Sequence, residues 1–187
     1  MGWIILAIVI VIIALVLWAV GAYNALVALR NRVKNGWAQI DVQLKQRADL
    51  IPNLVETVKG YAAHESQVFT QVTQARASAL QAAQSGDVAQ RIQAENQLSR
   101  AIMNLQAVAE AYPQLQANQN FLDLQAQLKA LEEKIAYARQ FYNDVVQKYN
   151  TKIEVVPTNI IAGLFHFEQA AYFQVDEADR QAPQVKF

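Results

Sequence analysis

The stretch RADLIPNLVETVKGY, residues 47–61, places a proline inside a run that otherwise has the apolar spacing of a helix. Apolar residues on both sides of Pro52 recur in steps of three and four, so the stripe keeps its phase across the proline. One interpretation is a continuous helix kinked at Pro52, which loses one backbone hydrogen bond. The other takes Asp49 as the N-cap of a new helix, with Pro52 in its first turn. The unbroken phase of the apolar stripe favours a continuous helix kinked at Pro52, whereas the similar lengths of the resulting segments favour a new helix capped by Asp49. Both interpretations stay open.

Outward from this stretch, the chain has apolar stripes at helical spacing and no sustained alternation typical of strands. Breaks are expected at QSGDV, residues 84–88, and at AYPQLQANQN, residues 111–120. The sequence therefore predicts an all-α protein whose soluble part is an antiparallel bundle of long helices. The bundle has four helices, or three if the first is kinked at Pro52. The four-helix alternative uses the segments 24–48, 50–84, 88–112 and 119–153.

A long apolar segment, WIILAIVIVIIALVLWAVGAY, covers residues 3–23 without a charged side chain. As a helix it would span about 31 Å, which matches the hydrocarbon core of a bilayer. The alternative is a cleaved signal peptide, for which Ala19 and Gly21 offer small residues near a cleavage site. Because no basic region precedes the apolar run, we expect a retained single-pass transmembrane helix. Arg30, Arg32 and Lys34 follow the span and predict a short external N-terminus with the rest in the cytoplasm.

The segment NIIAGLFHFEQAAYF, residues 159–173, is too apolar for a solvated tail and too short to cross a membrane. We expect a short amphipathic helix, capped by Thr158 or Asn159, whose apolar face docks on the bundle or on a neighbouring subunit. The alternative is an interfacial helix lying on the bilayer, although no lysine or arginine adjoins it in the sequence. Residues 176–187 are expected to be solvated. The candidate contact residues are Ile161, Leu164, Phe165, Phe167, Tyr172 and Phe173.

The search for chemistry excludes most classes of site. The formal net charge is zero, which gives no case for nucleic-acid binding, and there are no cysteines. His64–Glu65 begins a zinc-protease pattern that fails because residue 68 is valine. Asp41, Lys45 and Asp49 are four residues apart on one helix face and are expected to form i,i+4 ion pairs on a solvated surface. We therefore expect no catalytic residue, no cofactor and no metal.

Five pieces of the sequence stand out together. They are YNALVALRNRV (23–33), GWAQIDVQLKQRADLIPNLVETVKGYAAHE (36–65), AYPQLQANQNF (111–121), KIAYARQFYNDVVQKYN (134–150) and a P-x-N…F…YF pattern from Pro157 to Phe173. Taken together, these pieces resemble the LemA family of bacterial membrane proteins. The resemblance implies a single-pass anchor in the bacterial inner membrane and a cytoplasmic helical bundle. Gln46 departs from the family pattern, in which a second basic residue is usual.

The resemblance also singles out a candidate interaction surface in the opening stretch. The alternative is a structural role for the same residues, with Asp49 capping, Pro52 bending the chain, and Arg47 and Asn53 satisfying backbone groups. The surface consists of Arg47, Asp49, Pro52, Asn53, Glu56 and Lys59.

The expected function is a non-enzymatic scaffold that self-assembles as a homo-oligomer at the cytoplasmic face of the membrane and organises or shapes it. The alternative is an adaptor or regulator of another envelope protein, such as a membrane metallopeptidase, which the resemblance permits. The expected partners are the lipid bilayer, further copies of the chain and, in the alternative, another membrane protein. The expected division is an anchor (1–23), a bundle (24–156) and a C-terminal segment (157–187).

Overall fold

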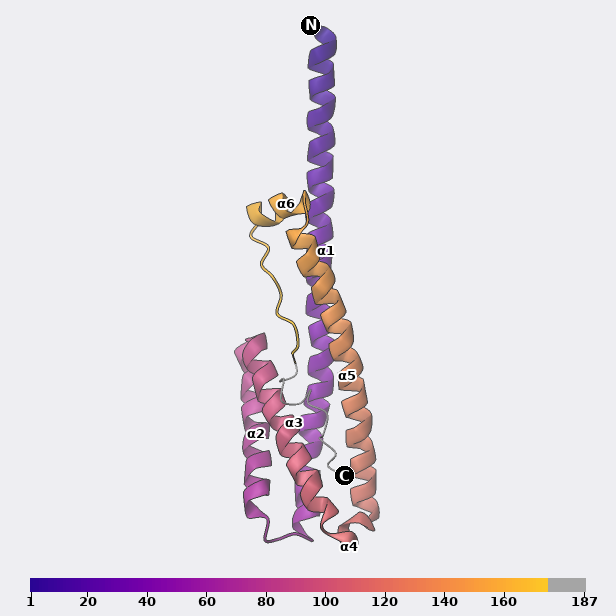
Figure 1. The fold of residues 1–187 in the computed structure, drawn as a ribbon, viewed down its shortest axis with the longest axis vertical. Coiled ribbons are helices and arrows are strands. Elements are labelled where there is room, and N and C mark those ends of the chain that lie inside the picture. The colour runs from indigo at the N-terminus through magenta and orange to yellow at the C-terminus, as the bar shows by residue number, and fades with distance from the viewer. Residues whose placement is uncertain (175–187) are drawn as a thin grey trace, which may run out of the picture. The chain divides into compact units, whose positions relative to one another are not determined.

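A computed structural model describes residues 1–174, and these form helices and connecting segments without a strand (Figure 1). The all-α prediction is confirmed. The predicted solvated stretch 176–187 lies outside the described residues. The helices are α1 (Gly2–Lys59), α2 (Ser66–Ser85), α3 (Val88–Glu110), α4 (Pro113–Gln116), α5 (Gln119–Glu154) and α6 (Thr158–Leu164).

The chain divides into two compact units. Unit 1 consists of Met1–Ala38 and Gln140–Tyr172, and the described residues of unit 2 are Gln39–Arg139 together with Phe173 and Gln174. Helices α1 and α5 each contribute to both units. The predicted division at residues 23 and 156 concerns the roles of the segments and stays a prediction.

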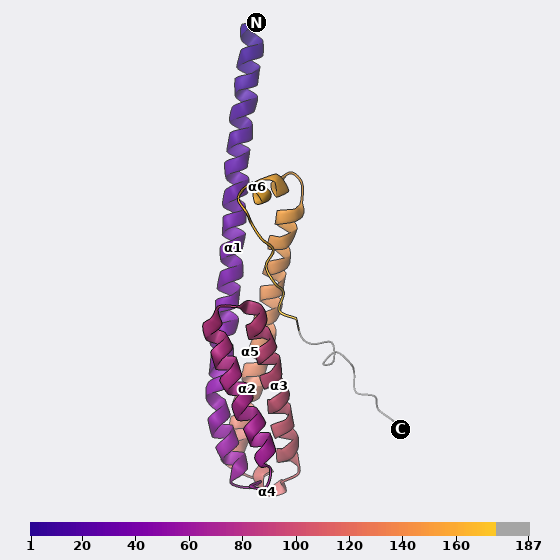
Figure 2. The same ribbon diagram turned by 90° about the vertical axis from the view of Figure 1, so that its left-hand side faces the viewer.

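Unit 2 is a bundle of four helices: the C-terminal part of α1, α2, α3 and the N-terminal part of α5 (Figures 1 and 2). Short connections join consecutive helices, which therefore run antiparallel. The predicted apolar stripes form one core, to which α4 adds Leu115 at the end of the bundle. Among the buried residues are Ile51, Val55, Val58, Phe69, Val72, Leu98, Ile102, Leu105, Phe121 and Leu128.

The structure decides between the two interpretations of Pro52, because α1 continues through the proline to Lys59. The prediction of a new helix capped by Asp49 is wrong. Proline has no N–H to donate to the carbonyl of Ala48, four residues earlier. Arg76 of α2 donates from Nε to that carbonyl oxygen at 2.7 Å. A side chain from the neighbouring helix thus satisfies the group that the proline leaves unpaired.

The predicted helix 50–84 is also wrong, since the chain leaves the helix after Lys59 and starts α2 at Ser66. The amides of Tyr61 and Ala62 both donate to the carbonyl oxygen of Val58, at 3.0 and 2.9 Å. These bonds close the last turn of α1. Gly60 adjoins this end, where its low helix propensity favours termination.

The predicted break at residues 84–88 is confirmed. Gly86 has a φ of 73°, a left-handed conformation that ends α2. Asp87 is the N-cap of α3, and its side chain accepts hydrogen bonds from the amides of Ala89 and Gln90 at 2.8 and 3.2 Å. At the next break, which is also found, Pro113 starts the short α4, which was not predicted.

Unit 1 packs α1, from Ala19 to Val33, against the end of α5 and against α6. One cluster of its buried residues consists of Leu26, Tyr149, Ile161, Ala162 and Phe167. Helix α6 is shorter than the predicted segment, and the chain after it is extended. The predicted cap is wrong, because Thr158 is a buried residue inside the helix and no side-chain cap hydrogen bond forms. The extended part is held by α5 instead.

Two side chains of α5 hold this extended part through its backbone. Asn150 donates to the carbonyl of Ala170 and accepts from the Ala170 amide, both at 2.9 Å. Tyr142 donates its hydroxyl to the carbonyl of Ala171 at 2.8 Å. Burial raises the pKa of Tyr142, so the phenol stays protonated and keeps its donor.

Candidate functional site

The core of unit 2 contains a cluster of charged side chains in addition to its apolar residues. Its charged side chains come from α1, α3 and α5, and α2 contributes the backbone carbonyl of Ala79. The cluster has three arginines and three acids, so its formal charges balance. Its members, called the charge cluster below, are Asp41, Arg47, Arg91, Glu95, Glu132 and Arg139.

Arg47 of α1 makes the most contacts in the charge cluster, and its side chain is 0% exposed. Its Nη2 lies 2.6 Å from Glu95 Oε2, and its Nη1 lies 2.8 Å from Glu132 Oε1 and 2.9 Å from Ser99 Oγ. One guanidinium therefore joins α1 to α3 and α5. Its planar set of donors suits several acceptors at once.

Arg91 of α3 extends the charge cluster to α2 and to an earlier turn of α1. Its Nη2 lies 3.0 Å from Glu95 Oε1 and 3.2 Å from Asp41 Oδ1, while Nη1 donates to the carbonyl of Ala79. Glu95 therefore lies between two guanidinium groups and is itself 0% exposed. Removing Glu95 would weaken the pairing of two buried arginines at once, so the loss of this one acid is expected to be costly.

Arg139 of α5 is the third arginine. Burial and the positive charge of Arg47 lower its pKa, whereas the charges of Glu132 and Glu95 raise it. Its guanidinium lies 4.4 Å from the ring centroid of Phe173, the favourable geometry of a cation–π contact. The buried ring of Phe173 therefore covers the Arg139 guanidinium.

The charge cluster is suited to holding helices in register and unsuited to binding a substrate. The oxygens of Glu95 face arginines of the same chain, and neither Arg47 nor Glu95 is exposed to solvent. An acid that acts on a substrate must be able to reach it. Within residues 1–174 no group of three or more acidic, histidine or cysteine side chains is arranged to hold a metal ion.

The residues of the predicted interaction surface are partly buried and partly exposed in the structure. Arg47 belongs to the charge cluster, so its prediction as a surface residue is wrong. Asp49 pairs with Lys45 at 2.8 Å on the exposed face, which confirms this i,i+4 pair and leaves Asp49 no capping role. The expected pairing of Asp41 on the same face is wrong, because Asp41 pairs with Arg91 of α3 at 3.2 Å. The residues that remain exposed around the proline are Pro52, Asn53, Glu56 and Lys59.

The predicted contact residues of the C-terminal segment also divide. Ile161 and Phe167 pack in the core of unit 1, and Phe173 is buried in unit 2. Leu164, Phe165 and Tyr172 are exposed. The segment thus has one packed face and one free face.

The apolar segment at the start of α1 is the largest exposed apolar surface among the described residues. From Trp3 to Val20 its large side chains are 41–86% exposed. Within residues 1–174, α1 is the one helix long and apolar enough to cross a membrane. A helix whose apolar side chains are exposed on all sides is stable only in an apolar environment.

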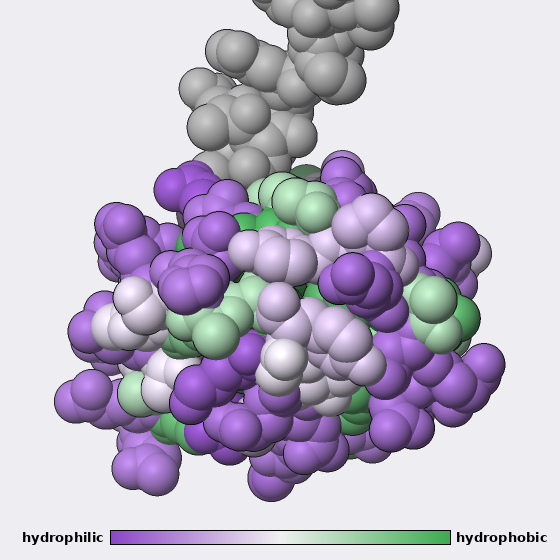
Figure 3. Space-filling model, turned by 90° about the horizontal axis from the view of Figure 1, so that it is seen from below, coloured by the Kyte–Doolittle hydropathy of each residue, from purple (hydrophilic) through white to green (hydrophobic). Residues whose placement is uncertain are grey.

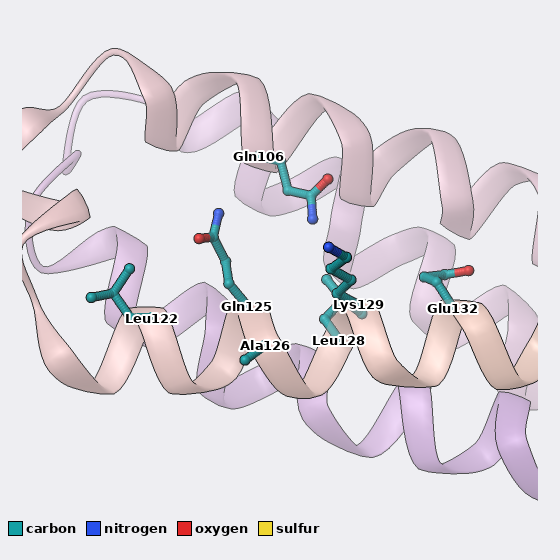
Figure 4. Close-up of a pocket in the computed structure, with 7 residues that line it drawn as sticks. All are labelled: Gln106, Leu122, Gln125, Ala126, Leu128, Lys129 and Glu132. Atoms are coloured by element: carbon teal, nitrogen blue, oxygen red, sulfur yellow. The ribbon is translucent and has the colours of Figure 1, made fainter.

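A groove of about 550 Å³ lies between α3 and α5 (Figure 4). Its lining includes the amides of Gln106 and Gln125, the ammonium group of Lys129 and the apolar side chain of Leu122. Glu132, at one end, already accepts a hydrogen bond from Arg47. The lining residues offer no nucleophile with a positioned base.

The end of unit 2 formed by α4 and the α1–α2 connection is mostly hydrophilic, with apolar residues scattered singly (Figure 3). Isolated apolar side chains of this kind are usual on a solvated surface.

Comparison with known proteins identifies relatives over most of the chain. A model of the LemA family matches residues 36–187. Magnetosome proteins MamQ 2 and MamQ 1 of Paramagnetospirillum magneticum are each 25% identical over 175 residues. These alignments cover 81% of this chain and 64% of each relative, so the chain spans under two thirds of their length. Protein LemA of Metamycoplasma hominis is 25% identical over 163 residues, covering 86% of this chain and 73% of the relative.

Proposed function

Because this chain belongs to the LemA family, we propose that it is a membrane-anchored, non-enzymatic helical scaffold that assembles with further copies of itself. The bundle of unit 2 then works at the cytoplasmic face of a bacterial inner membrane, which the assembly organises or shapes. The observation that carries the proposal is α1 itself. One uninterrupted helix has a fully exposed apolar segment of membrane-spanning length and then supplies core residues of the bundle.

The proposed orientation depends on the charges that follow the apolar segment. Arg30, Arg32 and Lys34 are all exposed on α1 just after the apolar run. Basic residues close to a membrane span favour the cytoplasmic side. The proposed topology therefore has the start of the chain outside and the bundle inside.

A non-enzymatic role is supported by how the charged groups are used. The most buried acid, Glu95, is neutralised by Arg47 and Arg91, and this arrangement joins helices. Two of the relatives are named as magnetosome proteins, and a scaffold at a membrane surface agrees with those names. Confinement to a membrane raises the effective concentration of the bundle, so modest affinity between copies would suffice for assembly.

The test is resonance energy transfer between copies in vesicles. Since the chain has no cysteine, a single Gln74→Cys variant, at an exposed position of α2, can carry a donor or an acceptor dye. Self-assembly predicts transfer above that of randomly placed molecules at low protein-to-lipid ratio, and its loss on adding unlabelled chain. Transfer at the random level at every ratio would contradict self-assembly. Crosslinking in native membranes that recovers a stoichiometric foreign protein instead would support the adaptor alternative.

A further inference from the structure

The apolar residues around α6 fall on two faces of unit 1. Ile161, Ala162 and the following Phe167 are buried against α1 and α5. The other face is exposed: Val156 is 78%, Ile160 65% and Leu164 69% accessible. This second face, called the apolar collar below, consists of Val155, Val156, Ile160, Leu164 and Phe165.

The apolar collar is fixed at the C-terminal end of the apolar segment of α1. The ring of Phe165 lies 4.7 Å from that of Tyr23, centroid to centroid, and Phe167 lies 5.8 Å from the same ring. Ala19 and Ala22 also pack against the core that holds α6. Figures 1 and 2 both show α6 beside α1. The collar thus meets α1 within about a turn of the end of the apolar run.

Polar groups lie next to the residues of unit 1 that adjoin the apolar collar. The guanidinium of Arg30 lies 5.0 Å from the ring centroid of Phe167 and is exposed. Gln169 donates to Glu154 at 2.6 Å, which places a polar pair beside the packed face. The sequence separates Arg30 from α6 by more than a hundred residues, but the fold brings them together. A basic residue bordering an apolar face is the pattern of an interfacial helix.

We propose that the apolar collar lies in the boundary between headgroups and acyl chains, on the side of the bilayer at which the apolar segment of α1 ends. Arg30 then faces the lipid phosphates. The inference rests on the proposed membrane anchoring. Lipid is the occupant because the collar adjoins, through the contact of Phe165 with Tyr23, the exposed apolar segment of α1 that is proposed to lie in the bilayer. Five side chains are far fewer than the roughly 20–30 residues a side of a stable protein interface.

The test measures where single spin labels lie in the bilayer. The cysteine-free chain allows Leu164→Cys and Ile160→Cys to be labelled cleanly. The control is Gln147→Cys, an exposed polar position of α5 in the same unit, and Ile10→Cys reports on the apolar segment. Full-length chain is reconstituted in phosphatidylcholine–phosphatidylglycerol vesicles. Collision rates with oxygen, which concentrates in lipid, are compared with those of a water-soluble nickel complex.

The proposal predicts that the labels at 160 and 164 collide more with oxygen than with nickel, whereas the label at 147 does the reverse. If the labels at 160 and 164 behave like 147 while 10 stays in lipid, the collar proposal is overturned and the anchor stands. If 10 also collides mainly with nickel, membrane anchoring itself fails. Low collision rates with both reagents, together with spin–spin broadening, would mean that a second copy covers the collar, which also overturns the proposal.

Discussion

Glu95 is a buried acid whose carboxylate pairs with two buried arginines, Arg47 and Arg91. Glu95→Gln keeps the shape of the side chain but leaves Arg47 and Arg91 without the carboxylate between them. Arg47 then keeps only Glu132 and Arg91 keeps only Asp41, and both acids are partly exposed. Because the buried cluster would carry a net positive charge, we expect the free energy of unfolding to fall by about 3–5 kcal/mol. The measurement is urea unfolding of the full chain in detergent, followed by circular dichroism at the helical band.

The matched control is Glu133→Gln, the same chemical change at an exposed position of α5. It should alter the free energy of unfolding by less than about 0.5 kcal/mol. Equal effects of the two substitutions would mean that the charge cluster contributes nothing to stability.

Tyr142 gives unit 1 a predicted dependence on alkaline pH. Burial raises its pKa above that of the unfolded chain, which is about 10. The folded state therefore holds its proton more tightly, and the contribution to stability is complete below pH ~10 and is lost as the pH rises through the folded pKa. We expect the melting temperature of the wild type to fall more steeply above pH ~10 than that of Tyr142→Phe. Parallel curves for the two proteins would contradict a buried, titrating phenol.

At the scale of the element, α1 continues through Pro52 because α2 supplies a substitute donor. Arg76→Ala removes the 2.7 Å bond to the Ala48 carbonyl, and we expect a loss of about 1.5–3 kcal/mol, the range for hydrogen bonds to charged groups. In a Pro52→Ala background, the restored N–H can donate to that carbonyl. The cost of Arg76→Ala should then drop to less than half, as a double-mutant cycle would measure. An unchanged cost would show that Arg76 acts through some other contact.

The stripes of the bundle could be predicted from apolar spacing, but the charge cluster could not. The apolar stripe of α1 is interrupted between Leu44 and Ile51, and in the structure Arg47 occupies the buried position between them. In α3, Glu95 fills the corresponding gap between Ile92 and Leu98 in the same way. The signal available in the sequence was a charged residue at a position where the helical spacing of the apolar residues predicts a core residue. Its partners could not be read from the sequence, because they depend on which helices become neighbours.

Helix ends were predictable only where turn chemistry was local. Gly86 and Asp87 mark the α2–α3 break without help from the rest of the fold. The end of α1 at Lys59 was missed, although Gly60 and the long stride to Phe69 both indicated it. The contact between Arg30 and the aromatic residues after α6 was hidden by sequence distance.

At the scale of the whole molecule, the charge cluster of unit 2 and the exposed apolar segment of α1 have separate roles. The ion pairs of the charge cluster join α1, α3 and α5 within unit 2, while the apolar segment of α1 is exposed and requires a lipid surrounding. Because α1 contributes to both units, the element that is proposed to enter the membrane also supplies part of the bundle core. The account therefore depends on whether that segment is retained in the lipid.

Alkaline carbonate extraction of membranes from cells that express the chain, followed by intact-mass measurement, tests this most directly. The account predicts that the polypeptide stays in the membrane pellet with residues 1–21 still attached. Recovery of the chain in the aqueous supernatant, beginning after Gly21, would contradict it.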